Sequence, residues 1–122
     1  MNQSINLSSS EESFEFNDRY ELIDGPGHAW LKVPIQEIVQ LELAEKISTY
    51  SYMDTQFVYL EEDLDLSVFI RARAGLPECS QCSAEDDAKA REFCNRSVYV
   101  NYHEQPFVRR LPYYNASKLN VQ

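Results

Sequence analysis

The sequence predicts an α+β fold: a small single domain in which two or three short helices pack on a mainly antiparallel sheet. Short runs that alternate aromatic or β-branched residues with polar ones are separated by turn-forming residues, which is typical of hairpins. Between these runs, apolar residues recur at spacings of three and four, as on one face of a helix. The length of 122 residues suits one domain.

A hairpin is predicted over residues 20–34, followed at once by a helix. Leu22 and Ile23 lie in one arm, residues 29–33 form the other, and "DGPG" supplies the turn. Pro34 suits the first helical position, because its missing N–H needs no partner there. The apolar residues of this helix and of the helical turn after it are Ile35, Ile38, Val39, Leu43 and Ile47.

The stretch "TYSYMDTQFVYLEE" gives the clearest strand signal, a second hairpin that turns at "MDTQ". Its alternating aromatic residues are Tyr50, Tyr52, Phe57 and Tyr59. A helix follows in "LSVFIRARAG", where Asp65 suits the N-cap and Gly75 the C-cap. The buried stripe of that helix is Leu66, Phe69 and Ile70.

A third helix is predicted in "SAEDDAKAREFCN", because Ser83 and Asp86 stand in capping-box register and acids fill the first turn. This helix is expected to end at Asn95. The chain then closes with two extended pieces, which contain Val98, Val100 and Tyr102 in the first and Phe107 and Val108 in the second.

The domain is expected to occupy residues 18–116. Residues 1–17 are acidic and rich in serine, which predicts a disordered tail, and residues 117–122 form a second tail. The N-terminus has neither the basic head nor the apolar run of a secretory signal. No run of about 18 apolar residues would span a membrane, so we expect a cytoplasmic location and reduced cysteines.

Charge is distributed unevenly along the chain. The net charge is −9, but residues 1–70 carry 14 acids against three bases, whereas residues 71–122 carry six acids against eight bases. Such a dipolar molecule would be steered toward a basic partner protein. Nucleic-acid binding is disfavoured, because phosphate contacts need clustered lysine and arginine. Solubility alone also accounts for an acidic composition.

Three stretches, "GPGHAWLKVP", "KISTYSYMDTQFVYLEED" and "FVRRLPYY", resemble a small bacterial domain of unknown function that occurs on plasmids, integrated elements and phages. The resemblance covers about residues 20–74 and 98–114. Ala29 and Glu42 stand where that family usually has glycine, and residues 77–96 look like an insertion. The resemblance implies no reaction. It implies that the gene lies on elements that often encode small accessory and counter-defence proteins.

Four carboxylates follow the second hairpin within five positions. A two-metal nuclease needs a nearby lysine or histidine, but no lysine occurs between positions 46 and 89, and a calcium loop would need a central glycine. Helix initiation explains Asp63 and Asp65, which leaves Glu61 and Glu62 facing solvent or a partner. The predicted partner-binding residues are Glu61, Glu62, Asp63, Asp65, Asp54 and Tyr59.

A CxxC pair precedes the third helix. Cys79 and Cys82, with Cys94 and His103 further on, have a spacing that allows a zinc site, because CxxC is a common zinc knuckle. A redox pair is disfavoured, since the strand and helix context of thioredoxin-like motifs is missing. Unmetallated cysteines in a tolerated insertion are the third interpretation.

His28 and two arginines are the remaining candidates. His28 follows Gly27 in a tight turn, where it either orders the turn or acts as a general base or ligand. No serine or cysteine lies in a recognisable nucleophile context to use it. Arg109 and Arg110 stand beside aromatic residues, an arrangement that suits nucleic acid. Two arginines are few against the net charge, so we expect them to pair with the acidic cluster inside the domain.

The leading hypothesis is a non-enzymatic acidic binding protein from a phage or other mobile element. It would be an inhibitor of anti-CRISPR or anti-restriction type, a DNA mimic that occupies a basic, nucleic-acid-binding surface of a host protein. One alternative is a regulatory module stabilised by zinc at Cys79, Cys82, Cys94 and His103. The other is a small enzyme that uses His28 with the carboxylates at 61–63. The sequence leaves the oligomeric state open.

Overall fold

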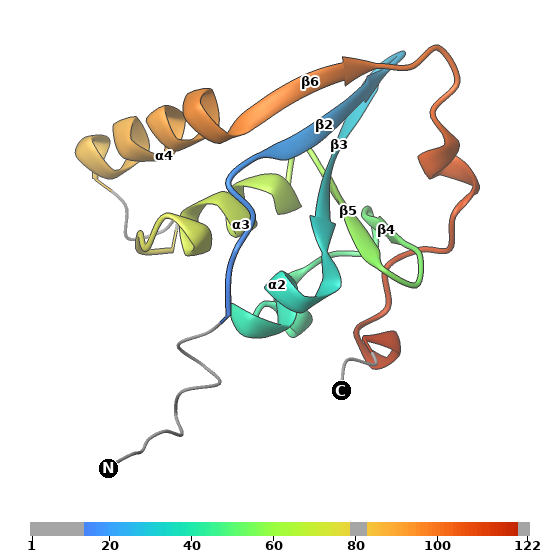
Figure 1. Ribbon diagram of the computed structural model, residues 1–122, viewed down its shortest axis with the longest axis horizontal. Coiled ribbons are helices and arrows are strands. Elements are labelled where there is room, and N and C mark those ends of the chain that lie inside the picture. The colour runs from blue at the N-terminus through green and yellow to red at the C-terminus, as the bar shows by residue number, and fades with distance from the viewer. Residues whose placement is uncertain (1–13, 79–82, 120–122) are drawn as a thin grey trace.

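The protein is built around a five-stranded mixed sheet (Figure 1). The computed structural model describes residues 14–78 and 83–119. Its strands are β2 (Tyr20–Gly25), β3 (His28–Pro34), β4 (Tyr52–Met53), β5 (Phe57–Glu61) and β6 (Val98–Tyr102). They lie in the order β4-β5-β3-β2-β6, with helices packed against one face, so the predicted α+β class is confirmed.

Both predicted hairpins are present and share one sheet. β2 pairs antiparallel with β3, and β4 pairs antiparallel with β5. An antiparallel pairing of β3 with β5 joins the two hairpins. β6 adds to the other edge parallel to β2. The sheet is therefore mainly antiparallel, as predicted, with one parallel pair that the sequence did not indicate.

Within the described residues, three α-helices and one short 3-10 helix lie between strands, and two further 3-10 helices follow β6. They are α2 (Ile35–Gln40), α3 (Asp65–Arg73), α4 (Ala84–Ser97), η1 (Ala44–Lys46), η3 (Phe107–Arg110) and η4 (Ala116–Lys118). The predicted capping box of α4 is confirmed, since Ser83 and Asp86 exchange side-chain and backbone hydrogen bonds. α4 continues through Ser97 rather than ending at Asn95. The second extended piece predicted near the C-terminus is instead the 3-10 helix η3.

The ends of α3 differ from the prediction by one residue. Leu64 is the N-cap, so Asp65 lies inside the first turn and does not cap the helix. At the other end Ala74 is the C-cap, and Gly75 follows it with a φ of +73°. Gly75 therefore takes the left-handed position just beyond the helix, which glycine adopts without steric cost.

α2 turns a different set of side chains inward than its apolar stripe predicted. Pro34 ends β3 and caps the helix rather than opening it. Val39 is 42% exposed, whereas Glu37 is 2% exposed. The predicted burial of Leu43 and Ile47 is confirmed. The helix therefore buries a carboxylate, because hydrogen-bond donors from other elements meet it there.

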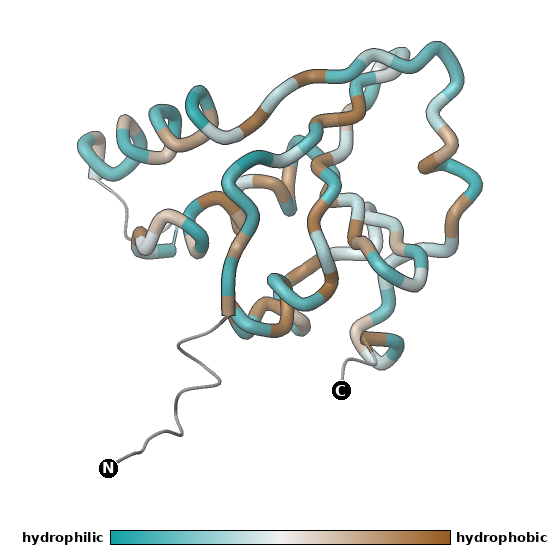
Figure 2. Tube along the Cα trace, in the orientation of Figure 1, coloured by the Kyte–Doolittle hydropathy of each residue, from teal (hydrophilic) through white to brown (hydrophobic). Residues whose placement is uncertain are grey.

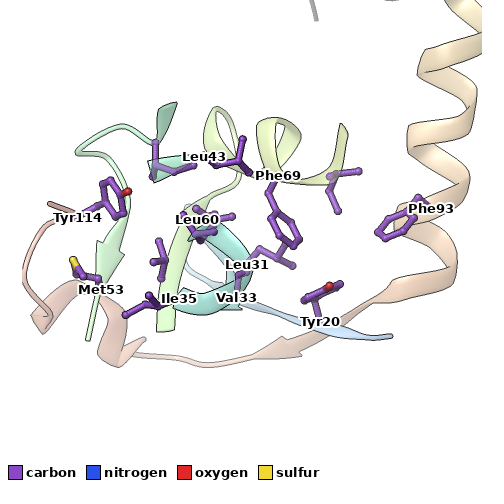
Figure 3. Close-up of a cluster of buried hydrophobic side chains, with 14 residues drawn as sticks. Tyr20, Leu31, Val33, Ile35, Leu43, Met53, Leu60, Phe69, Phe93 and Tyr114 are labelled. Atoms are coloured by element: carbon purple, nitrogen blue, oxygen red, sulfur yellow. The ribbon is translucent and has the colours of Figure 1, made fainter. Parts of the chain in front are cut away.

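The main core lies between the sheet and the helices (Figure 3). Strand register places Leu31 of β3 beside Leu60 of β5, and Phe69 of α3 packs on this layer. The buried residues of this core are Tyr20, Leu31, Val33, Ile35, Ile38, Leu43, Ile47, Met53, Val58, Leu60, Phe69, Ile70, Phe93 and Tyr114. α4 contributes little to it and is mostly hydrophilic along its length (Figure 2).

The second face of the sheet carries a smaller core, formed by Ile23, Trp30, Tyr59 and Val108. Val108 belongs to η3, so the C-terminal segment covers this face. Gly25, at the end of β2, allows that segment to approach closely, because a Cβ added there would lie 2.3 Å from Cγ of Pro106. A bulkier residue at position 25 would push the segment away from the sheet.

The described chain begins inside the predicted tail at 1–17, of which residues 1–13 lie outside the description. The N–H of Asn17 donates to Oε2 of Glu37 at 2.8 Å. Nη2 of Arg73 donates to the carbonyl oxygen of Asn17 at 3.1 Å. The end of this segment is therefore held between α2 and α3.

Replacing Glu42 with glycine is expected to raise the free energy of unfolding by about 0.5–1 kcal/mol. Glu42 follows α2 with a φ of +59°, a conformation that favours glycine. Its N–H donates to the carbonyl of Val39 and the N–H of Leu43 donates to that of Ile38, both at 3.0 Å, which is a Schellman motif. Urea titration measures the gain. Glu42→Ala removes the same charge but keeps the strained backbone, so it should not stabilise the protein.

Candidate functional site

Acidic residues from two strands meet at one end of the sheet. Asp24 near the end of β2 lies opposite Ala29 on β3, and Glu61 at the end of β5 lies opposite Trp30. The N–H of Glu62 donates to the carbonyl of Ala29 at 3.0 Å, which holds the residues after β5 against β3. We call the set Asp24, Glu61, Glu62 and Asp63 the acidic end.

These carboxylates repel one another. Burial raises the pKa of Glu62 above its usual value, and the charges of Asp63, Asp24 and Glu61 raise that pKa further. Within residues 14–78 and 83–119, no lysine or arginine nitrogen lies within 4.0 Å of any carboxylate of the acidic end. This part of the chain therefore holds like charges together without an internal counter-ion.

The members of the acidic end differ in how freely they can move. Glu61 is half-buried, and its Oε1 accepts a hydrogen bond from the N–H of Leu64 at 3.1 Å. Glu62 and Asp63 are exposed. The turn after β5 therefore fixes one carboxylate and presents two others to solvent.

Asp65, predicted to bind a partner, is only 3% exposed. Its carboxylate accepts hydrogen bonds from the N–H of Ser48 at 3.1 Å, from Oγ of Ser48 at 2.7 Å and from Oγ of Ser51 at 2.5 Å. Oγ of Ser51 in turn accepts from the N–H of Glu61 at 2.9 Å. Asp65 therefore stabilises the backbone at Glu61 through Ser51 and is itself buried.

Tyr59 and Asp54 bond to each other inside the second hairpin. Tyr59 is 2% exposed, and its hydroxyl donates to Oδ2 of Asp54 at 2.9 Å. Burial, followed by this hydrogen bond, raises the pKa of the Tyr59 hydroxyl above its usual value. Oδ1 of Asp54 accepts from the N–H groups of Gln56 and Phe57 at 2.8 and 2.7 Å, which shapes the β4–β5 turn. The burial of Tyr59 takes it off the surface that a partner would meet.

The structure brings His28 to the acidic end, because this residue opens β3. Its ring stacks on Trp30 with the ring centres 5.9 Å apart. Trp30 meets Tyr52 edge-on at 6.1 Å, and Tyr52 stacks on Tyr113 at 5.3 Å. We call His28, Trp30, Tyr52 and Tyr113 the aromatic row. It leads from the acidic end across the second face to Tyr113, which is 66% exposed.

The expected pairing of Arg109 and Arg110 with the acidic cluster is not seen among the described residues. The guanidinium carbon of Arg109 lies 5.7 Å from the ring centre of Trp30, a cation–π contact. Neither arginine has a described carboxylate oxygen within 4.0 Å. η3 thus places Arg109 over the aromatic row instead of beside the acids.

The four predicted zinc ligands are not brought together where the structure describes them. Cys79 and Cys82 lie outside the described residues. Cys94 is half-buried on α4, where burial raises the pKa of its thiol, and His103 follows the end of β6. The five residues of β6, roughly 16 Å of extended chain, lie between the helix that carries Cys94 and the position of His103. No cluster of three or more metal-binding side chains occurs in the described ranges.

Sequence reasoning missed Asp24 and the path of the aromatic row. Asp24 precedes Gly25 and Pro26, where aspartate is an ordinary turn residue, so the local pattern carried no functional signal. Tyr113 reaches Tyr52 only through a bridge between the C-terminal segment and β4. Knowledge of the strand register would have placed Asp24 near the acids after β5 and Tyr113 beside Tyr52.

Comparison of the chain with protein-family models finds no match, and comparisons with curated proteins and with solved structures also find none. No helix in the described part of the chain is long and apolar enough to cross a membrane. The fold and the site therefore define the class directly. This is a small α+β protein whose acidic end has no counter-ion among the described residues and lies beside an aromatic row.

Glu62→Gln is expected to stabilise the free protein at pH 7, because it removes a charge that neighbouring carboxylates repel. The gain should be only about a few tenths of a kcal/mol, since this side chain is exposed. The pKa of Glu62 in the folded protein lies above the ordinary value of 4.5, so its ionised form opposes folding at neutral pH. This penalty disappears as the pH falls through the raised pKa toward 4.5. Urea titrations at pH 7 and about pH 4 should show the difference only at pH 7. A variant less stable than wild type at pH 7 would contradict this account.

Proposed function

We propose that the protein is a non-enzymatic binding protein whose acidic end docks on a basic surface of a partner protein. The observation that carries the proposal is the group of carboxylates without a counter-ion among the described residues. Holding like charges together costs free energy in the free protein. Lysine or arginine side chains of a partner would remove that cost, so binding would relieve an electrostatic strain that folding creates.

Glu62 and Asp63 would make the direct ion pairs, because both are exposed. Glu61 would accept a further contact from a fixed position, since the N–H of Leu64 already holds one of its oxygens. Asp65 would hold the backbone at Glu61 through Ser51 without touching the partner. Because the carboxylate of Glu61 is already fixed, it would lose little side-chain entropy on binding, which favours affinity.

The aromatic row supports a protein as the partner rather than a small ion. Tyr113 stands exposed at one end of the row, and tyrosine is enriched in the cores of protein interfaces. The acids at the other end of the row would supply steering and register. We therefore expect a protein interface in which the acidic end makes the charged contacts and Tyr113 is the aromatic anchor.

The resemblance to a domain of phages and mobile elements suggests which partner to expect. We infer a host protein with a basic groove that binds nucleic acid, such as a restriction enzyme or a CRISPR effector. The carboxylates would take the place of backbone phosphates, so the protein would act as a DNA mimic and an inhibitor.

The test uses the full chain as bait in a host lysate, with two charge-matched variants. Glu62→Gln/Asp63→Asn removes the exposed charges of the acidic end. The control, Glu45→Gln/Glu92→Gln, removes two charges that are also exposed but lie elsewhere. We expect the first variant to weaken binding of the captured partner about tenfold and the control to leave it unchanged. Raising the salt concentration should weaken the wild-type complex, and the wild type should displace nucleic acid from the partner.

Three results would contradict the proposal. Binding that does not respond to salt would show that charge is not the basis of recognition. Equal losses in both double variants would show that net charge, and not the acidic end, is recognised. A captured partner that keeps its nucleic acid in the presence of this protein would remove the inhibitor function.

A further inference from the structure

β6 forms an open edge of the sheet. No described segment pairs with its outer side, and it lies along the upper outline of the molecule (Figure 1). Val100 is 46% exposed and Tyr102 is 77% exposed. Proteins usually protect such an edge with lysine, proline or a bulge. The sequence of β6, "VYVNY", contains neither a charged residue nor a proline.

The direction of the backbone groups on this edge follows from one hydrogen bond. The N–H of His103 donates to the carbonyl of Asp24 at 2.9 Å, so residue 103 faces β2. In a parallel pair alternate residues bond to the neighbouring strand. Tyr99 and Asn101 therefore also face β2, and the N–H and C=O groups of Val98, Val100 and Tyr102 point outward.

We propose that β6 pairs antiparallel with β6 of a second copy of this chain, around a two-fold axis at Val100. Under that symmetry only registers centred on a residue keep paired side chains on the same face. Centring on Val100 gives every outward residue a partner, with Val98 opposite Tyr102 of the other copy. Centring on Tyr99 or Asn101 leaves Tyr102 or Val98 without a strand partner. The two sheets then form one continuous sheet, and the proposal does not depend on the proposed function.

Charge favours the same register. Arg96, in the last turn of α4, stands four residues before Val100, and Glu104 stands four residues after it. Both are exposed and flank β6 at its two ends, so the two-fold axis places Arg96 of each copy at the same end of the strand pair as Glu104 of the other. β6 also belongs to the half of the chain, residues 71–122, in which bases outnumber acids by eight to six. Two copies that meet at β6 therefore avoid most of the repulsion that the whole-chain net charge of −9 would cause, and Arg96 and Glu104 supply the attraction.

Sedimentation equilibrium of the full chain tests the pairing. We expect a concentration-dependent species with twice the 14.2 kDa of one chain. Arg96→Glu and Glu104→Arg should each weaken the dimer about tenfold, because each replaces two attractions by repulsions. An equimolar mixture of the two variants should restore it, since opposite charges face each other again in the heterodimer. A chain that stays monomeric, or a mixture that fails to recover, overturns the proposal.

A second pair of variants locates the contact. Val100→Lys sets two like charges at the axis and should leave only the single chain, while the fold should tolerate it because Val100 is 46% exposed. Val39→Lys makes the same change at an exposed valine of α2, and it should leave the dimer intact. Thermal melts followed by circular dichroism check that both variants are folded. A dimer that survives Val100→Lys, or that Val39→Lys also dissociates, overturns the proposal.

Discussion

Replacing Asp65 with alanine is expected to lower the free energy of unfolding by about 4 kcal/mol, the largest effect we predict for a single substitution. The buried carboxylate accepts hydrogen bonds from the backbone and hydroxyl of Ser48 and from the hydroxyl of Ser51. Alanine would leave these largely buried donors without their acceptor, and each such loss costs about 1–3 kcal/mol. Because a domain of this size is stable by only about 5–15 kcal/mol, the variant should be close to unfolding at 37 °C.

Urea titration followed by tryptophan fluorescence measures this effect, since Trp30 is the single tryptophan and is 2% exposed. Asp63→Ala is the matched control. It removes the same side chain two residues earlier, where the carboxylate is exposed, and should change stability by less than about 0.5 kcal/mol. Asp65→Asn keeps one acceptor oxygen and should fall between the two. Equal effects of Asp63→Ala and Asp65→Ala would show that Asp65 has no special structural role.

Glu37→Ala is expected to cost about 3 kcal/mol, the second-largest effect. Glu37 is 2% exposed, and its two oxygens accept from the hydroxyl of Tyr20 at 2.6 Å and from the N–H of Asn17 at 2.8 Å. Nε of Arg73 donates to the same Tyr20 hydroxyl at 3.1 Å. Burial, followed by the hydrogen bond to Glu37, raises the pKa of Tyr20 above its usual value, so the hydroxyl stays a donor. Removing Glu37 leaves the Tyr20 hydroxyl and the Asn17 N–H without their acceptor.

A double-mutant cycle separates this network from simple loss of packing. Tyr20→Phe removes the hydroxyl and keeps the ring against Phe69. If the hydrogen bond matters, Tyr20→Phe and Glu37→Ala should be non-additive by about 1 kcal/mol. Glu45→Ala, at an exposed glutamate in η1, is the control and should be neutral within about 0.5 kcal/mol. Additive losses would show that Glu37 and Tyr20 act independently.

The split of the acidic cluster changes how its function is assigned. The sequence attributed Asp63 and Asp65 to the start of a helix and left Glu61 and Glu62 for a partner. In the structure Asp65 is buried, Asp63 is exposed, and Asp24 joins from another strand. The charged surface therefore consists of residues from both hairpins. At the start of α3, Asp65 bonds to Ser48 and Ser51 instead of capping the helix.

Features that rest on neighbouring residues could be predicted from the sequence. The two hairpins follow from alternation and turn chemistry, and the start of α4 follows from the exchange of hydrogen bonds between Ser83 and Asp86. The left-handed position after α3 was marked by Gly75. These features are fixed by backbone geometry and by contacts within one turn, so a single sequence contains the necessary information.

Burial and strand order depend on residues that are distant along the chain, so only the tertiary structure decided them. Val39 and Glu37 differ in burial because Tyr20 and Asn17 reach one face of α2 and not the other. β6 lies parallel to β2 because α4 returns the chain to that edge. The sequence by itself determined the elements and the excess of acid. Long-range pairing determined which acids stand together, since register, and not spacing, sets the distance between residues on different strands.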